Sequence, residues 1–294
     1  MTDQLEIPVA GGELAVFRLG ASDHAEPAVL AIHGITASSR AWLAVQRALG
    51  DRASLIAPDL RGRGRSNQLP TPHGIEAHAQ DMLAILDHLG LERALVVGHS
   101  LGAYIAARLA DDHPDRVQAL ILVDGGLTIP GIEGVDPQEF IDGFLGPAVA
   151  RLRMSFETRE AYRNWWRSHP AFANSDVDDR DLAAYADHDL IGSAPQLRPA
   201  VSEQAVRADA AELFTMGEPT KRLTVSARML CAPLGILNDD RPMQPLWLAR
   251  EWAAAASDQR RVTLVEHVNH YTITMGAAGA AAVAEAVAEA LSAG

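Results

Sequence analysis

The chain is poor in cysteine and has no long hydrophobic run. Cys231 is the only cysteine, so no disulfide forms within the chain, which is typical of a reducing cytoplasm. Because it lies in an apolar run, we interpret Cys231 as a small core residue rather than a nucleophile. No stretch reaches about 18 apolar residues, because Glu285 and Glu289 interrupt the Ala-rich end. We therefore expect no transmembrane helix, no signal peptide and a cytoplasmic location.

Positive charge is also scarce. The chain has 25 Lys and Arg against 38 Asp and Glu, a formal net charge of -13. Such a surface repels phosphate backbones and anionic lipids, so we expect no nucleic-acid partner and no membrane partner. The sequence has no H-E-x-x-H motif, no paired Cys/His cluster and no G-x-G-x-x-G after a strand, so it predicts no metal and no cofactor. The oligomeric state stays open, and a homo-oligomer is compatible with the sequence.

Short apolar runs alternate with helical patterns in most of the chain. We predict strands at Leu5–Val9, Glu13–Arg18, Ala28–Ile32, Ala53–Ala57, Ala94–Val97, Val117–Val123, Val225–Ala232 and Arg261–Glu266. We predict helices at Ser38–Leu49, Ile75–Leu89, Leu101–Asp111, Pro245–Ala256 and Ala277–Leu291. Buried parallel strands joined by crossover helices give this alternation. Residues 127–221 interrupt it with a helical pattern that shows no strand alternation. The sequence therefore predicts an α/β core of residues 1–126 and 222–294, with a helical cap at 127–221.

A motif with chemical meaning lies between a predicted strand and a predicted helix. Gly98-His99-Ser100-Leu101-Gly102 is G-x-S-x-G, and a serine on so sharp a turn projects its hydroxyl above the sheet edge. Gly98 and Gly102 avoid side-chain clashes across the turn. The helix that follows directs its amide dipoles at developing negative charge. We predict that Ser100 is a nucleophile rather than a helix N-cap between two glycines.

Four motifs are spread along the chain: Leu30-Ala31-Ile32-His33-Gly34, Pro58-Asp59-Leu60-Arg61-Gly62-Arg63-Gly64-Arg65-Ser66, Gly98-His99-Ser100-Leu101-Gly102 and Asn269-His270. Together they resemble the α/β-hydrolase fold family, and the resemblance covers nearly the whole chain. The resemblance implies a mostly parallel eight-stranded sheet flanked by helices, with the cap inserted after the sixth strand. It also implies that the backbone amides of Ile35 and Leu101 form an oxyanion hole, and that His33 braces the loop without reacting.

The catalytic base is expected after the last core strand. His267 and His270 are the candidates there, and the resemblance favours His270 because the family places its histidine after a short loop, behind a small or polar residue such as Asn269. His267 falls at the strand end. The remaining histidines are interpreted as solvated, namely His24, His73, His78, His88, His113, His169 and His188.

The acid that orients the base has two candidate positions. Most of the family places it after the seventh strand, but here only Asp239 and Asp240 follow that strand, several residues late. Asp124 directly follows the predicted sixth strand, and haloalkane dehalogenases and zearalenone-type lactonases are similar in carrying an acid at that point. We favour Asp124 and keep Asp240 or Asp239 as the alternative. The serine nucleophile argues against dehalogenases and epoxide hydrolases, which attack with aspartate.

The resemblance implies that the cap is a lid over a substrate pocket. Its aromatic residues would suit a bulky hydrophobic substrate, and Trp165 and Trp166 are chosen as pocket contacts. The expected function is a serine esterase or lactonase that works through an acyl-enzyme. One alternative is a C–C bond hydrolase of the meta-cleavage type, with arginines of Arg61–Arg65 or Arg151 and Arg153 binding a dienoate. The other alternative is a non-hydrolytic ligand receptor, or a transferase, on the same scaffold.

Overall fold

The computed structural model describes residues 3–20, 27–131, 136, 146–212 and 215–293. One sheet has the strand order β1-β2-β4-β3-β5-β6-β9-β10. In this sheet, the neighbouring strands of the series β4-β3-β5-β6-β9-β10 are all parallel, whereas β2 is antiparallel to both β1 and β4. The bounds are β1 Asp3–Val9, β2 Gly12–Leu19, β3 Ala28–Ile32, β4 Ser54–Pro58, β5 Ala94–His99, β6 Val117–Val123, β9 Ala227–Cys231 and β10 Arg260–Leu264. The predicted α/β class and its mostly parallel eight-stranded sheet are confirmed.

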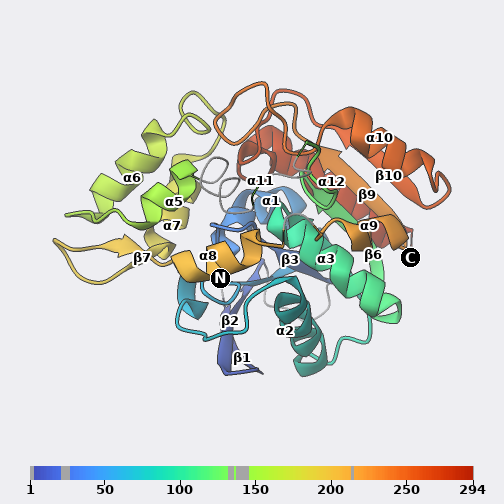
Figure 1. Cartoon of the computed structure of the whole chain (residues 1–294), viewed down its shortest axis with the longest axis horizontal. Helices are drawn as coiled ribbons and strands as arrows, with labels where there is room; N and C mark the ends of the chain where they lie inside the picture. Colours follow the sequence, from blue (N-terminus) through green and yellow to red (C-terminus); the bar gives the residue numbers. More distant parts are fainter. Residues whose placement is uncertain (1–2, 21–26, 132–135, 137–145, 213–214, 294) are drawn as a thin grey trace.

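Helices cover both faces of this sheet (Figure 1). One face carries α2 (Ile75–His88), α3 (Leu101–Asp112), α9 (Glu218–Arg222) and α10 (Leu246–Ala254), and the other carries α1 (Leu43–Leu49), α11 (Thr272–Met275) and α12 (Ala277–Ser292). Short 3-10 helices lie at Ser39–Trp42, Gly50–Arg52, Gly64–Ser66 and Pro114–Arg116. Each face has its own buried apolar cluster, as expected for parallel strands covered on both sides.

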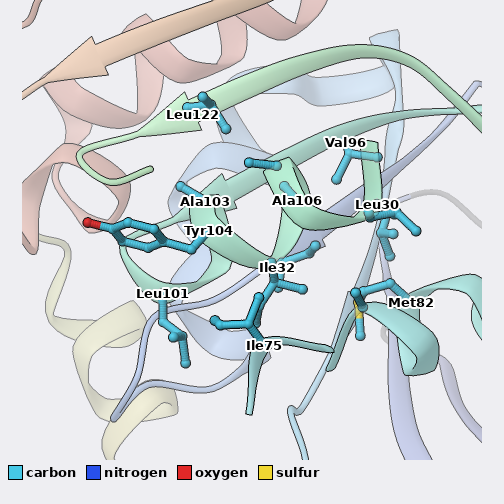
Figure 2. Packing of buried hydrophobic residues seen from close by; sticks show 14 of the residues in the cluster. Leu30, Ile32, Ile75, Met82, Val96, Leu101, Ala103, Tyr104, Ala106 and Leu122 are labelled. Carbon is cyan, nitrogen blue, oxygen red and sulfur yellow. The ribbon is translucent and has the colours of Figure 1, made fainter. Parts of the chain in front are cut away.

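Helix α3 packs closely on the middle of the sheet. Figure 2 shows its Ala103 and Ala106 among Leu30, Val96 and Leu122, which come from β3, β5 and β6. Small side chains on the helix face allow this close packing. Cys231 lies in the same cluster, and burial raises the pKa of its thiol to about 12. The packing fixes the N-terminus of α3 at the carboxyl ends of the strands.

The chain between β6 and β9 contains residues 127–221, which the sequence predicts as a cap and which we call the cap segment. It includes α5 (Gly146–Leu152), α6 (Arg159–Ser168), α7 (Asp179–His188) and α8 (Glu203–Ala210), and α5 to α7 lie on the opposite side of the molecule from α10 in Figure 1. Aromatic residues give it a separate buried cluster. It also holds an antiparallel ribbon of β7 (Leu190–Ile191) and β8 (Arg198–Pro199), which the sequence analysis did not predict. Strands of two residues are too short to show alternation.

The cap segment meets the core through buried polar contacts, and we call this boundary the seam. Arg63 of the core lies 2.6 Å from Asp209 of α8, which also contacts His78 of α2. His188 of α7 lies 2.6 Å from Asp59, which follows β4. The expectation that these two histidines are solvated is therefore wrong, because each contacts a carboxylate across the seam. His24 lies outside the described residues.

Within the described residues, no helix is both long and apolar enough to cross a bilayer.

Candidate active site

Ser100 occupies the turn that joins β5 to α3. Its backbone has φ 54° and ψ −119°, a left-handed conformation that a serine rarely adopts. A Cβ on Gly98 would lie 2.2 Å from the carbonyl oxygen of Gly102, and a Cβ on Gly102 would lie 2.0 Å from that of Ile32. Side chains at these glycines would force the turn open, so both are required for the close approach of α3 to the strands.

Ser100, His270 and Asp124 form one hydrogen-bonded chain. His270 Nε2 lies 3.0 Å from Ser100 Oγ, and His270 Nδ1 lies 2.7 Å from Asp124 Oδ2. Because a carboxylate only accepts hydrogen bonds, the imidazole proton is on Nδ1 and Nε2 is free to accept the serine proton. The three predicted residues therefore lie in the geometry that general-base activation of a serine requires.

Asp124 is fixed directly after β6. Its carboxylate is fully buried, and Oδ1 accepts a hydrogen bond from the Ala232 amide at 3.1 Å. The next residue must be glycine, because a Cβ on Gly125 would lie 2.5 Å from the carbonyl oxygen of Ser100. The alternative acids lie elsewhere: Asp240 is exposed, and Asp239 lies at the cavity wall, where it pairs with Arg241.

His99 contacts the predicted base, His270, through a hydrogen bond and through its ring. Its Nε2 donates to the carbonyl oxygen of His270 at 2.8 Å, and the two rings lie 4.7 Å apart. Burial holds the pKa of His99 well below the usual value, so the ring stays neutral. The sequence analysis did not single it out, although its place immediately before the nucleophile was a usable signal.

The predicted oxyanion-hole residues flank Ser100. Leu101 is the first residue of α3, so its amide has no acceptor within the helix. Ile35 follows Gly34, and a Cβ on Gly34 would lie 3.2 Å from Cβ of Ser100, so this loop lies against the serine. Both Ile35 and Leu101 line the cavity that Ser100 faces. His33 braces the loop as expected, accepting from the Leu60 amide at 2.9 Å and donating to the Gly34 carbonyl at 2.7 Å.

A mostly apolar cavity of about 190 Å³ lies over these residues. Its wall includes apolar side chains of Ile129, Leu237 and Met275, and it also includes His169. Burial and, after it, the charge of Arg151 lower the pKa of His169 to about 4, so the His169 side chain is uncharged at neutral pH. His169 was expected to be solvated; it is half-buried at the cavity instead.

The two tryptophans chosen as pocket contacts do not reach the cavity. Trp166 is buried in the cap cluster, where its ring packs 5.2 Å from Tyr185 and 5.5 Å from Phe172. Trp165 is half-buried and packs edge-on against Trp166. Neither is among the described residues that line the cavity. Adjacent residues on a helix point in directions about 100° apart, and here both directions meet other rings of the cap.

The described residues contain no group of three or more His, Cys, Asp or Glu side chains that could hold a metal ion.

Comparison with known proteins identifies the family. A model of the alpha/beta hydrolase fold matches residues 27–188. Lipase LipV of Mycobacterium tuberculosis is 34% identical over 174 residues, which cover 58% of this chain and 63% of the lipase. An uncharacterized protein of the same organism is 38% identical over 122 residues, and the alignment spans only 35% of that relative.

Solved structures agree with the fold. The crystal structure of E-2-(acetamidomethylene)succinate hydrolase has a TM-score of 0.81 at 21% identity, covering 99% of this chain and 100% of that one. A thioesterase domain from the curacin biosynthetic pathway has a TM-score of 0.73 at 18% identity, covering 98% of each chain. Identities this low support the fold alone. The matched family model establishes that the chain belongs to the α/β-hydrolase fold family.

Proposed function

We propose that the protein is a serine hydrolase that cleaves a carboxylic ester or lactone of a hydrophobic substrate through an acyl-enzyme. The observation that carries the proposal is the chain from Ser100 Oγ through His270 to Asp124, with 3.0 and 2.7 Å contacts, at an apolar cavity. A lipase among the relatives is consistent with ester chemistry. The cap segment 127–221 would be the lid domain over a core of 1–126 and 222–294, and the lone buried cysteine fits a reducing cytoplasm.

The proposed reaction follows from the geometry. His270 Nε2 takes the proton of Ser100 Oγ as the oxygen attacks the substrate carbonyl carbon, and the amides of Ile35 and Leu101 stabilise the oxyanion. His270 then protonates the leaving alkoxide, and the C–O bond breaks to give the acyl-enzyme. Water, deprotonated by the same nitrogen, attacks the acyl carbon and releases the acid while Ser100 regains its proton. Asp124 keeps the imidazole in the reactive tautomer throughout.

The cavity favours an ester over a dienoate. A dienoate substrate needs a cationic anchor, and two of the suggested arginines have other partners: Arg61 pairs with Asp81, and Arg63 pairs with Asp209. None of Arg61, Arg63, Arg65, Arg151 and Arg153 is among the described lining residues. Arg241 does line the cavity, but its side chain is 82% exposed and paired with Asp239.

A substrate screen with one matched variant tests the proposal. We expect wild-type protein to hydrolyse p-nitrophenyl esters and lactones, and a fluorophosphonate probe to label Ser100. Ser100→Ala should lose ester hydrolysis, lactone hydrolysis and labelling by the probe, while its melting temperature stays close to wild type. Turnover of a dienoate but of no ester would favour the C–C hydrolase. Failure of the probe to label the wild-type protein, with no turnover of any substrate, would overturn the proposal.

A further inference from the structure

Three consecutive carbonyls of the loop at residues 34–37, which we call the oxyanion loop, are each held by a buried side chain. The Gly34 carbonyl accepts from His33 Nδ1, and the Ile35 carbonyl accepts from Arg63 Nε at 2.9 Å. The Thr36 carbonyl accepts from Nη2 of Arg151 at 3.1 Å. His33 and Arg63 belong to the core, whereas Arg151 comes from α5 of the cap segment. The cap therefore contributes one of the three fixed points of this loop.

The hydrogen bond from Arg151 to the Thr36 carbonyl is linked to the Ile35 amide, which is proposed to bind the oxyanion. The Thr36 carbonyl and the Ala37 amide belong to one planar peptide unit, so holding one orients the other. The Ala37 amide donates to the Gly34 carbonyl at 3.2 Å. The Gly34 carbonyl shares its peptide unit with the Ile35 amide, which therefore points the opposite way. Arg151 is thus connected through two peptide units to the Ile35 amide proposed for the oxyanion hole.

The guanidinium of Arg151 is itself held rigidly. Its side chain is 1% exposed, and its Nη1 donates to Asp189 and to the hydroxyl of Tyr162. The central carbon of the guanidinium, Cζ, lies over the Trp166 ring, 4.9 Å from the ring centre. One end of the planar fork therefore binds the cap while the other end binds the oxyanion loop. A lysine ammonium, which is a single point of charge, cannot span both ends of such a fork.

We propose that Arg151 is a positioning residue that orients the Ile35 amide, so that docking of the cap completes the oxyanion hole. The proposal rests on the proposed hydrolase function, because it gives the Ile35 amide its purpose. Arg151 acts through the backbone and does not touch the substrate, since it is not among the described residues that line the cavity. Its loss should weaken stabilisation of the tetrahedral intermediate more than binding of the substrate.

Arg151→Lys is the informative variant, because it keeps a charge for Asp189 but loses the donor to Thr36. Removal of a direct oxyanion donor lowers kcat about 10²–10³-fold, and for an indirect contact we expect a loss of roughly 10- to 30-fold. KM should change less than about threefold, because ground-state binding is preserved. The inhibition constant of phenylboronic acid, which forms a tetrahedral adduct on Ser100, should rise by the same factor as kcat falls.

Asp181→Asn is the matched control for a loosened cap. Asp181 of α7 pairs with Arg47 of α1 across the seam and makes no described contact with the oxyanion loop. We expect its kcat and boronate affinity to stay within about twofold of wild type. The double variant Arg151→Met/Asp189→Asn removes the loop contact without leaving a buried carboxylate unpaired, and it should behave as Arg151→Lys. Equal losses in Asp181→Asn and Arg151→Lys, or a raised KM with unchanged kcat in Arg151→Lys, would overturn the proposal.

A readout that needs no activity separates this proposal from the hydrolase proposal. Amide exchange of Ala37, measured in the Ser100→Ala background, reports directly on the bond from Ala37 to Gly34. We expect faster exchange when Arg151→Lys is added and unchanged exchange when Asp181→Asn is added. If Ala37 exchanges faster in Arg151→Lys but the wild-type chain is not labelled by the fluorophosphonate, the hydrolase proposal is contradicted and the positioning role of Arg151 is not. Unchanged Ala37 exchange in Arg151→Lys would contradict the positioning role.

Discussion

Asp124 and Asp209 are both fully buried, and their surroundings are similar, but they lie in different regions of the molecule. Each contacts a histidine, His270 or His78, and each accepts a hydrogen bond from a backbone amide. Asp124 lies at the carboxyl edge of the sheet, where its histidine also faces Ser100 and a cavity. Asp209 lies in the seam, where Arg63 balances its charge. A His–Asp pair is therefore not itself a sign of catalysis, because its position relative to a nucleophile and a cavity decides its role.

The largest expected effect is on activity at the sheet edge. Asp124→Asn should lower kcat about 10⁴-fold, because an amide that donates to His270 Nδ1 stabilises the wrong tautomer. The folded structure should persist, and circular dichroism would check this beside ester kinetics. Asp240→Asn, at an exposed position, is the control and should keep full activity. If Asp240→Asn lost several orders of magnitude while Asp124→Asn kept most of kcat, the acid would be misassigned.

The same chemical change in the seam should affect stability instead. Asp209→Asn leaves Arg63 without its counter-charge, and breaking a buried ion pair costs about 3–5 kcal/mol. Urea unfolding measures this loss, and kcat should fall far less than in Asp124→Asn. A loss under about 1 kcal/mol would mean that the charge pair contributes little to docking the cap.

Acidic pH should also weaken the fold through neutral buried histidines. Burial lowers the pKa of His33 from 6.5 to about 4, so the folded state holds it neutral while the unfolded chain protonates it. Its contribution is complete above pH 6.5 and is lost as the pH falls toward 4, on the order of 3 kcal/mol. Unfolding free energies between pH 8 and 4.5 test this, and His33→Asn should give a flatter profile. An equally steep profile in that variant would assign the effect to other groups.

Asp59 contributes in a lower pH range. Burial would raise its pKa, but the hydrogen bond and charge of His188 outweigh this and lower it to about 2. Its contribution is therefore present above pH 3.8 and is lost only as the pH falls through 2.

A partly exposed ion pair on the protein surface gives the smallest expected effect on the free energy of unfolding. Arg108 and Asp112 are paired at 2.6 Å on the surface of α3, with side chains 33% and 29% exposed. Asp112→Asn should cost less than about 0.5 kcal/mol, because solvent screens pairs one helical turn apart. Urea unfolding beside Asp209→Asn gives the contrast directly. Similar losses in both variants would show that burial does not distinguish the seam from the surface.

The sequence predicts the sheet edge well because its features are local. Ser100 and Asp124 each directly follow a buried, mostly apolar strand, and His270 follows the last strand after a short loop. The parallel order of these strands brings the three residues to one edge of the sheet. The seam has no local pattern. Asp209 and Arg63 are far apart in the chain, and a histidine such as His78 within a helix looks solvated until the partner carboxylate is known. The cavity wall is equally non-local, because the docking of the cap decides which of its aromatic residues face inward.

The insertion of the cap segment between β6 and β9 also affects how the chain is made. During synthesis, β6 is complete at Val123, but its neighbour β9 begins only at Ala227, about a hundred residues later. Until β9 forms, the edge of β6 opposite β5 has unpaired backbone N–H and C=O groups, and such an edge can pair with another chain. At a ribosomal rate of about 5–20 residues per second, that edge waits for several seconds. Overproduction of the protein should therefore risk aggregation before His270, which follows β10, has left the ribosome.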